Sequence, residues 1–523
     1  MSDAAQCDVL IVGAGLAGLA TALRLQAAGL RTEVLEAHSR PGGCAGYYVR
    51  SGFSFDVGAT TLVDFESGGV GADFLAEVGL PTLEGDFLPG YRAWLPDRCV
   101  NVYRGAADWA RERLQQLGDD TAHRRFWALV DSLSEAFWPA SRAGVKLPMR
   151  SLADLLNNAR ALSLRHAPLA RYMRWSMGDA LRHFGIAHSQ ALRGMLSMMV
   201  EDTVHAQLDT APFINAALGI NIRGAGLARA RGGMHGFMRS LVARYVALGG
   251  RLRYRHSVSV VEREGTAYRV TANGRSFAAT QVVLAVPAQL ATRLAPDMLA
   301  RPLRPYIERD AQAQGGGLVM FLGVPETEVA GQDYTHHQLL QDYARPLGMG
   351  NNMFISVSVP GDLMSAPAGH RSVMISTHCE LADWEGLDAA AHAQRKQEAS
   401  DLLLSYARRV YPQLGRTACV REFGTPQTYA AFTRRPRGAV GGARLTLANS
   451  NQNAIPYDLG PKGLWMVGDT TWPGLGTVAC VLASRHVAQG ARALHARASR
   501  RGSSLEGLWT TSRGWLRQPK PEL

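Results

Sequence analysis

The sequence predicts an α/β protein built on a doubly wound parallel sheet, into which a domain of mixed sheet and helices is inserted. Three observations support this prediction. A strand, a glycine-rich turn, a helix and a second strand follow one another within residues 7–37, which is the pattern of a parallel βαβ unit. Helical periodicity then dominates residues 68–227, and strand patterns return after it. The last globular segment, residues 463–494, again reads as a strand, a glycine-bearing turn and a helix.

Each element follows from a local pattern. The first strand is predicted from the apolar run CDVLIV of residues 7–12, and the first helix from the helical spacing of apolar residues over 16–29. Residues 31–37, RTEVLEA, read as the second strand. Residues 251–264 and 267–286 are rich in β-branched residues and are separated by turn signals, and residues 316–324 form another apolar run. We therefore expect the chain to re-enter a sheet after a mainly helical insert.

Composition bounds the function classes. A chain of 523 residues exceeds the size at which one core stops growing, so at least two packing units are expected. The 46% apolar and 19% charged residues indicate a folded globular protein. The net charge of +12 favours acidic surfaces such as anionic lipid or nucleic acid. No nucleic-acid-binding motif accompanies the charge, so we predict no nucleic-acid partner and interpret it as membrane attraction or bulk solubility.

The cysteines and the apolar runs suggest a compartment. The six cysteines lie far apart without a CxxC pair, which argues against a zinc site and against a disulfide framework. No run approaches the ~18 apolar residues of a spanning helix, and no signal peptide is evident at the N-terminus. We therefore expect a cytoplasmic protein that binds no metal. If the protein contacts a membrane, it lies on the membrane surface.

The strongest local signal is GAGLAG at residues 13–18, between the first strand and the first helix. Gly13 permits the tight turn, Gly15 lets the backbone approach a pyrophosphate, and Gly18 lets the helix pack on the strand, while Ala14 lies within the turn. Glu36 ends the second strand at the spacing of a ribose-hydroxyl acceptor, and its charge disfavours a 2′-phosphate. The pattern is Rossmann-like and favours NAD or FAD over NADP. A glycine turn without a ligand is the alternative.

Two further segments bear on that choice. Arg40 precedes the glycine pair Gly42-Gly43, beside which an extended ligand longer than an ADP moiety could pass. Near the other end, Gly468-Asp469 follows an apolar run, where the carboxylate could accept from a ribityl hydroxyl. A helix starting after Gly476 would stabilise negative charge on a reduced ring through its dipole. The alternative reading of the second segment is a capped turn.

Together these motifs resemble the carotenoid isomerase and phytoene desaturase family of FAD-dependent oxidoreductases, within the wider amine-oxidase-like flavoproteins. The isomerase and C-3′,4′-desaturase branch looks nearest, because CAGYY follows the glycine pair where main-line bacterial desaturases usually carry a basic residue. The resemblance covers roughly residues 8–492. It is carried by GAGLAGL at 13–19, PGGCAGYYVRSGFSFDVGAT at 41–60, RARGGMHGFMRSL at 229–241, SAPAGHR at 365–371, ADWEGL at 382–387, GTPQTYAAFTRRPRGAVGG at 424–442 and GDTTWPGLG at 468–476.

The resemblance implies FAD as cofactor and a role for each matching residue. Residues 13–18 would hold the pyrophosphate and Glu36 the adenosine ribose. Val258 would meet the adenine through its backbone, and Asp469 of the Gly468-Asp469 pair would bind the ribityl or pyrophosphate region. The remaining matches are Arg40, Gly42 and Gly43 beside the stretch between pyrophosphate and flavin, and Thr477 and Val478 at the pyrimidine edge of the flavin.

The same resemblance implies a discontinuous domain division. Residues 1–67, 228–300 and 455–495 would form the FAD-binding domain. Residues 68–227 and 301–454 would form the substrate domain, whose helical part faces a membrane. Residues 496–523 are basic and lack periodicity, so we predict a loosely ordered tail.

The implied reaction removes an allylic hydride from a lipophilic polyene or shifts its double bonds. The protein must then supply an apolar tunnel, for which MLSMMV at 195–200 and LVMFLGV at 318–324 are candidates, although each also reads as plain core. Glu201, Asp202 and His205 are close in sequence and could handle a proton, but a surface ion-pair cluster is the favoured interpretation. His336-His337 is interpreted as structural. No catalytic side chain is assigned.

Residues 165–184 interleave four arginines with Leu, Met, Trp and Phe, as an interfacial helix does. An ordinary solvated helix fits the pattern equally, and the lipid-dissolved substrates of the family favour the membrane. The expectation is a peripheral protein on the anionic inner face of the membrane, of open oligomeric state.

Two other functions compete with this one. An amine oxidase could use the same scaffold, but many of those enzymes keep a lysine near the flavin, and none of this chain's four lysines lies in a matching strand context. A non-catalytic scaffold that binds flavin and polyene would show the same motifs. Desaturation and isomerisation, the electron acceptor and the identity of the polyene all stay open.

Overall fold

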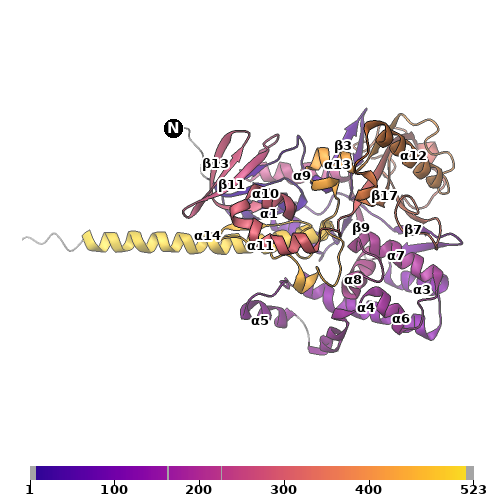
Figure 1. Ribbon diagram of the computed structural model, residues 1–523, viewed down its shortest axis with the longest axis horizontal. Coiled ribbons are helices and arrows are strands. Elements are labelled where there is room, and N and C mark those ends of the chain that lie inside the picture. The colour runs from indigo at the N-terminus through magenta and orange to yellow at the C-terminus, as the bar shows by residue number, and fades with distance from the viewer. Residues whose placement is uncertain (1–6, 162–163, 225, 514–523) are drawn as a thin grey trace, which may run out of the picture.

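In the computed structural model, three distant parts of the chain build one sheet (Figure 1). The structure describes residues 7–161, 164–224 and 226–513. The strand order is β10-β2-β1-β13-β12-β11, with β19 also paired to β13. The pairs of β10, β2, β1, β13 and β19 are parallel, whereas β11, β12 and β13 pair antiparallel. The strands are β1 (Cys7–Val12), β2 (Thr32–Leu35), β10 (Arg251–Arg253), β11 (Val258–Glu264), β12 (Ala267–Ala272), β13 (Arg275–Leu284) and β19 (Leu464–Met466).

Both faces of this first sheet are covered, as a doubly wound sheet requires. Alternate residues of β1 point to opposite faces: Val9 and Ile11 pack against one set of helices, and Leu10 and Val12 against the other. The first set is α1 (Leu16–Ala27), α9 (Gly233–Ala247) and α14 (Thr477–Arg513). The second set is α10 (Ala288–Leu294) and α11 (Pro296–Arg309). The predicted fold class is confirmed.

A second sheet joins the two inserted parts of the chain. Its order is β18-β14-β17-β16-β15-β7-β8, so residues 68–227, predicted to be mainly helical, contribute two of its strands. Each of these two is only five residues long, and such short runs give a weak period-2 signal. The strands are β7 (Gly90–Trp94), β8 (Cys99–Tyr103), β14 (Gly316–Pro325), β15 (His336–Leu340), β16 (Asn352–Val357), β17 (His370–Cys379) and β18 (Val420–Gly424).

Helices pack around this sheet. Helix α12 (Ala389–Ala407) shares a buried cluster with β14, β16 and β17. A helical layer forms a separate core against β7 and β8, from α3 (Ala106–Leu117), α4 (Thr121–Arg142), α6 (Met177–His183), α7 (Gln190–Val204) and α8 (Phe213–Gly224). The remaining strands and α-helices are β3 (Tyr47–Arg50), β4 (Phe53–Asp56), β5 (Leu62–Val63), α2 (Val70–Glu77), β6 (Gly85–Phe87), α5 (Leu152–Ala161), β9 (Leu227–Ala230) and α13 (Pro426–Thr433).

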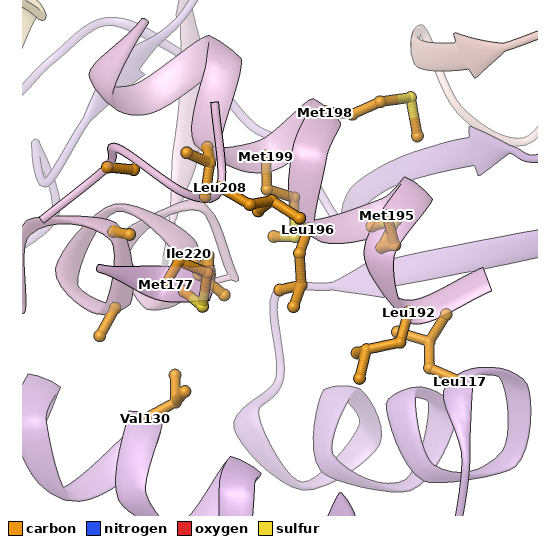
Figure 2. Packing of buried hydrophobic residues seen from close by; sticks show 14 of the residues in the cluster. Leu117, Val130, Met177, Leu192, Met195, Leu196, Met198, Met199, Leu208 and Ile220 are labelled. Carbon is orange, nitrogen blue, oxygen red and sulfur yellow. The ribbon is translucent and has the colours of Figure 1, made fainter. Parts of the chain in front are cut away.

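The methionine-rich stretch of α7 belongs mostly to that helical core. Met195, Leu196 and Met199 are fully buried among apolar residues of neighbouring helices. Figure 2 shows Met198 directed away from Leu192 and Leu196. Of this stretch, Met198 is the residue that reaches the large cavity described below. The tunnel-lining interpretation therefore holds for one side chain of MLSMMV, and the rest is core.

Two sequence predictions about the outside of the molecule are wrong. Residues 165–184 do not form one helix, because a 3-10 segment η2 (Leu164–Arg174) and helix α6 divide them where Ser176 caps α6 through a capping box with Asp179. Tyr172, Met177 and Leu181 of this segment are buried in the helical core, whereas Met173 is exposed, so most of its apolar side chains face the protein. The tail also differs from the prediction, because α14 continues to Arg513, and residues 514–523 lie outside the described chain. Within the described residues, no helix combines the length and hydropathy needed to cross a bilayer.

A candidate cofactor and substrate cavity

The glycine turn after β1 has the conformation that the sequence predicts. Gly13 has φ +101°, which disfavours residues with a side chain, and its N–H donates to the carbonyl of Leu35 at the end of β2. A Cβ atom on Gly18 would lie 2.2 Å from the Gly13 carbonyl oxygen and 2.7 Å from Cβ of Ala285. Gly13 and Gly18 therefore hold β1, α1 and β13 close together, and α1 begins at Leu16 with the N–H groups of its first turn facing the turn.

A second glycine turn lies beside the first. Gly42 has φ +118° and donates its N–H to the carbonyl of Ala14 at 2.8 Å. Gly15 and Gly42 form a parallel bridge, and a Cβ atom on Gly43 would lie 3.5 Å from Cα of Gly15. Side chains at these positions would narrow the space between the turns. A cradle of bare backbone fits an anionic, extended ligand such as the pyrophosphate of FAD.

Glu36 is fixed at the edge of this cradle. Its backbone N–H donates to the carbonyl of Arg253 at the end of β10. Its carboxylate accepts hydrogen bonds from the N–H groups of Ala14 at 2.6 Å and His38 at 2.8 Å. A carboxylate oxygen can accept more than one hydrogen bond, so Glu36 retains acceptor capacity for a ribose hydroxyl.

The third wall comes from the end of the chain. After β19, Gly468 takes φ +136°. The next residue, Asp469, forms a 2.5 Å ion pair with Arg435, and these two side chains are only 13% and 14% exposed. Although burial opposes the charge, the Asp469 carboxylate raises the pKa of Arg435. Helix α14 begins at Thr477, so the helix predicted after Gly476 is present at this wall.

These walls line one partly open cavity of about 920 Å³. It is lined by eleven of the thirteen predicted residues: Gly13, Gly15, Gly18, Glu36, Arg40, Gly42, Gly43, Val258, Gly468, Asp469 and Thr477. Ala14 donates its backbone N–H to the Glu36 carboxylate. Val478 packs against the apolar cluster between the first sheet and helices α1, α9 and α14. The structure thus brings together segments separated by more than four hundred residues in sequence.

The cavity continues across one face of the second sheet. Leu318, Val319 and Phe321 of β14 line it, so part of the predicted stretch 318–324 does face open space. Gln338 lies at the same wall, and within the described part of the chain its buried Oε1 atom has no hydrogen-bond partner. The other lining residues from this sheet are Gly317, Asn352, Met353, Phe354, Ser376, Thr377, His378, Glu422, Phe423 and Gly424.

At its far end the cavity meets a group of titratable side chains from α7 and β17. Glu201 is 7% exposed and lies 3.4 Å from Nδ1 of His378, so this member of the cluster predicted at the surface is buried and has its partner on strand β17, whereas Asp202 and His205 are half-buried. The His205 and His378 rings meet edge to face at 4.7 Å. Burial, with His378 and Arg444 nearby, holds the pKa of His205 well below its usual value. Asp202 accepts from Gln338 at 3.5 Å.

The sequence gives no signal for several of these residues. Gln338 and His378 lie in ordinary strand patterns, and only strand pairing brings them to the cavity. Arg435 lies inside the quoted motif at 424–442 but carries no prediction of its own. Lys396 lines the cavity from helix α12, so one lysine is present there, although not on a strand.

His336 and His337 are structural, as interpreted from the sequence. Both are fully buried. His337 accepts a hydrogen bond from the indole N–H of Trp94 at 3.2 Å and lies 2.9 Å from the hydroxyl of Tyr411, and burial lowers the pKa of His337 to about 3. Among the described residues, no group of three or more His, Cys, Asp or Glu side chains is arranged to hold a metal ion.

Known proteins resemble this chain over most of its length. Residues 16–490 match the family described as flavin containing amine oxidoreductase. The chain is 26% identical over 511 residues to prolycopene isomerase 1, chloroplastic, of an Oncidium hybrid cultivar, covering 92% of this chain and 82% of that protein. It is 24% identical to the lycopene-forming phytoene desaturase of a Paracoccus species, covering 92% and 96%.

Solved structures share the architecture. Putrescine oxidase bound to putrescine superposes with a TM-score of 0.62 at 16% identity, covering 93% of this chain and 99% of that one. An oxidoreductase from Methanosarcina mazei superposes with a TM-score of 0.61 at 17% identity, covering 92% and 100%. At these identities the matches establish the fold alone.

Proposed function

Because the chain belongs to the flavin-containing amine oxidoreductase family, we propose that this FAD-dependent oxidoreductase desaturates or isomerises a carotenoid-like polyene. One observation carries the proposal: the cradle of bare glycine backbone opens directly into an apolar cavity along the second sheet. The sequence relatives named as carotenoid isomerases and desaturases support the same substrate class.

We propose that the cradle holds FAD along its length. The first turn of α1, with Gly15 and Gly43, would face the pyrophosphate, and Glu36 would accept from the adenosine ribose. Val258 would meet the adenine, and Asp469 the ribityl chain. The remaining predicted contacts are Gly13, Ala14, Gly18, Arg40, Gly42, Gly468, Thr477 and Val478. When bound, the oxidised flavin supplies a hydride acceptor, which is the chemistry that side chains lack.

The second sheet would hold the polyene. Val319, Phe321 and Phe354 present apolar surface into the cavity, and a cavity wall of this kind binds a hydrocarbon chain by removing it from water. Excluding water also prevents water from adding to a cation delocalised along the polyene. The polyene would lie along β14 and β16, on the sheet face that carries Phe321 and Phe354.

Proton handling falls to His378 in this proposal. Desaturation removes a hydride and a proton from adjacent carbons and forms one C=C bond, so the protein needs a proton acceptor beside the polyene. With Nδ1 facing the Glu201 carboxylate, Nε2 of His378 carries the lone pair. The carboxylate stabilises the imidazolium that forms, as it does in other histidine–carboxylate pairs. Isomerisation would use the same cavity without net removal of hydrogen.

The domain division also stays a proposal. Residues 1–67, 228–300 and 455–495 would fold as the FAD-binding domain, and residues 68–227 and 301–454 as the substrate domain. We place the protein in the cytoplasm, at the inner face of the membrane, from which a lipophilic polyene would enter.

The experiment is an anaerobic assay with purified protein in dim light. The flavin spectrum is recorded, and the protein is incubated with oxidised or reduced FAD and a panel of carotenoids in liposomes. Bleaching of oxidised flavin together with a longer product chromophore establishes desaturation, whereas isomer interconversion that needs reduced flavin establishes isomerisation. Bound flavin with turnover of amines and no change in any polyene would refute the substrate class, and Lys396→Met would then test the lysine that lines the cavity.

A further inference from the structure

Helix α5 turns its apolar side outward. Leu152, Leu155 and Leu156, spaced as one face of a helix, are 79%, 50% and 59% exposed. The opposite face carries Asp154 and Asn158, which are buried at 9% and 5% exposure. In a helix that only covers a protein core, the leucines would be buried and the aspartate would be exposed.

Hydrogen bonds fix this orientation. The Asp154 carboxylate accepts from the N–H groups of Arg150 at 3.0 Å and Ser151 at 3.1 Å and lies 3.2 Å from Nζ of Lys146. The Asn158 amide bonds both the N–H and the carbonyl of Lys146, at 2.9 and 2.8 Å. Since the polar side of α5 is satisfied by the preceding loop, rotating the helix to bury its leucines would break these contacts.

The chain around α5 is strongly basic. Residues 146–176 contain six Lys or Arg residues and one acidic residue, the buried Asp154. Lys146 and Arg150 also pair with Asp458, so the basic excess comes from the four arginines of residues 160–174. Residues 162–163 connect α5 to η2, so the two elements are close neighbours, and both lie at an outer edge of the molecule (Figure 1). In η2, Met173 is 51% exposed, and Arg171 and Arg174 are also exposed.

We propose that Leu152, Leu155 and Leu156 of α5, with Met173 of η2, form a docking surface for an anionic lipid bilayer. The apolar side chains enter the boundary between headgroups and acyl chains, and Arg171 and Arg174 contact lipid phosphates. A bilayer partner explains why the leucines of α5 are exposed to solvent in the isolated protein. The excess of basic residues favours a negatively charged surface over a second copy of this basic chain. The inference rests on the proposed function only in that a polyene substrate is supplied from a bilayer.

The test measures binding of the full-length protein to vesicles that contain no polyene. Vesicles of phosphatidylcholine, with or without phosphatidylglycerol, are sedimented, and the bound fraction gives the partition coefficient. The triple variant Leu152→Glu, Leu155→Glu and Leu156→Glu is compared with Leu363→Glu, which changes an exposed leucine (70%) elsewhere on the molecule. Because each leucine leaving water contributes roughly a tenfold factor and enters the interface only in part, the triple variant should lose about 30-fold or more of the partition coefficient.

The control variant should bind as the unaltered protein does. Arg171→Gln with Arg174→Gln should weaken binding to the anionic vesicles and reduce its salt dependence. Equal vesicle binding by the triple variant and the control would overturn the proposal, as would a wild-type protein that ignores anionic vesicles and dimerises through this face. Failure of the polyene proposal is distinguishable, because vesicle binding needs no turnover, and turnover in detergent does not need docking.

Discussion

Replacing Gly15 by alanine separates a ligand-binding role from a structural one. Gly15 precedes α1 with φ −63° and ψ 166°, a conformation that alanine adopts freely. The nearest atom to its added Cβ would be the Gly42 carbonyl oxygen at 4.0 Å. The alanine causes no strain in the folded state, and it makes the unfolded chain less flexible. Without cofactor, Gly15→Ala should therefore be as stable as the original protein, or more stable by about 0.4–1 kcal/mol.

The same methyl group points into the cradle. It would keep the pyrophosphate away from the N–H groups of α1, and each charge-assisted hydrogen bond lost costs about 1.5–3 kcal/mol. The Kd for FAD should therefore rise about 10- to 100-fold. Flavin fluorescence titration gives the affinity, and thermal unfolding of the cofactor-free protein gives the stability.

Gly18→Ala is the matched comparison. Its Cβ would lie 2.2 Å from the Gly13 carbonyl oxygen, so this variant should lose about 1–3 kcal/mol of stability as well as FAD. If Gly15→Ala binds FAD as tightly as the original protein, the pyrophosphate does not lie against this turn, and the assignment of the cradle is refuted. If it instead loses stability as Gly18→Ala does, the space assigned to the cradle is already filled.

Three other outcomes follow from the site and its surroundings. His378→Asn should lower polyene turnover about 100-fold or more while leaving the FAD affinity unchanged; equal turnover in single-turnover assays would remove His378 from proton transfer. Arg435→Met should destabilise the cofactor-free protein by about 3 kcal/mol because it leaves the Asp469 carboxylate unpaired, and adding Asp469→Asn should restore the thermal midpoint. Lowering the pH from 7 to 5 should cost about 2 kcal/mol at His337, whose folded pKa is about 3 against 6.5 when unfolded, because only the unfolded chain takes up the proton. In urea titrations at the two pH values, His337→Gln should lose less stability than the original protein, and an equal loss would contradict this account.

Local sequence patterns predicted the residues that line the cofactor side of the cavity, but not the residues that line its substrate side. The turn around Gly15 and the strand end at Glu36 lie within one βαβ unit, where spacing alone determines neighbours. Gln338 and His378 lie on β15 and β17, and their approach to the cavity depends on how those strands pair with β16. No property of either residue's immediate neighbours in sequence indicates that pairing.

Amphipathic patterns posed a different problem. The spacing over residues 165–184 correctly indicates segments with an apolar side, but it cannot say whether that side meets protein or lipid. Tertiary packing buries Tyr172 and Leu181 and leaves Leu152 and Leu155 exposed. Glu201 illustrates the same limit, because its partner is His378 of β17 rather than His205 one turn along its own helix.

The order of strands in the first sheet has a consequence for synthesis on the ribosome. β1 emerges first, and its central residues Val9, Leu10 and Ile11 are completely buried in the finished protein, yet its neighbour β13 starts at residue 275 and β19 at residue 464. At ~5–20 residues per second, the sheet stays incomplete for roughly 20 to 90 s. During that time an apolar strand with an unpaired edge can associate with other nascent chains, so folding yield should depend on chaperones that bind β1. FAD can enter its complete site only after β19 and the start of α14 have been synthesised.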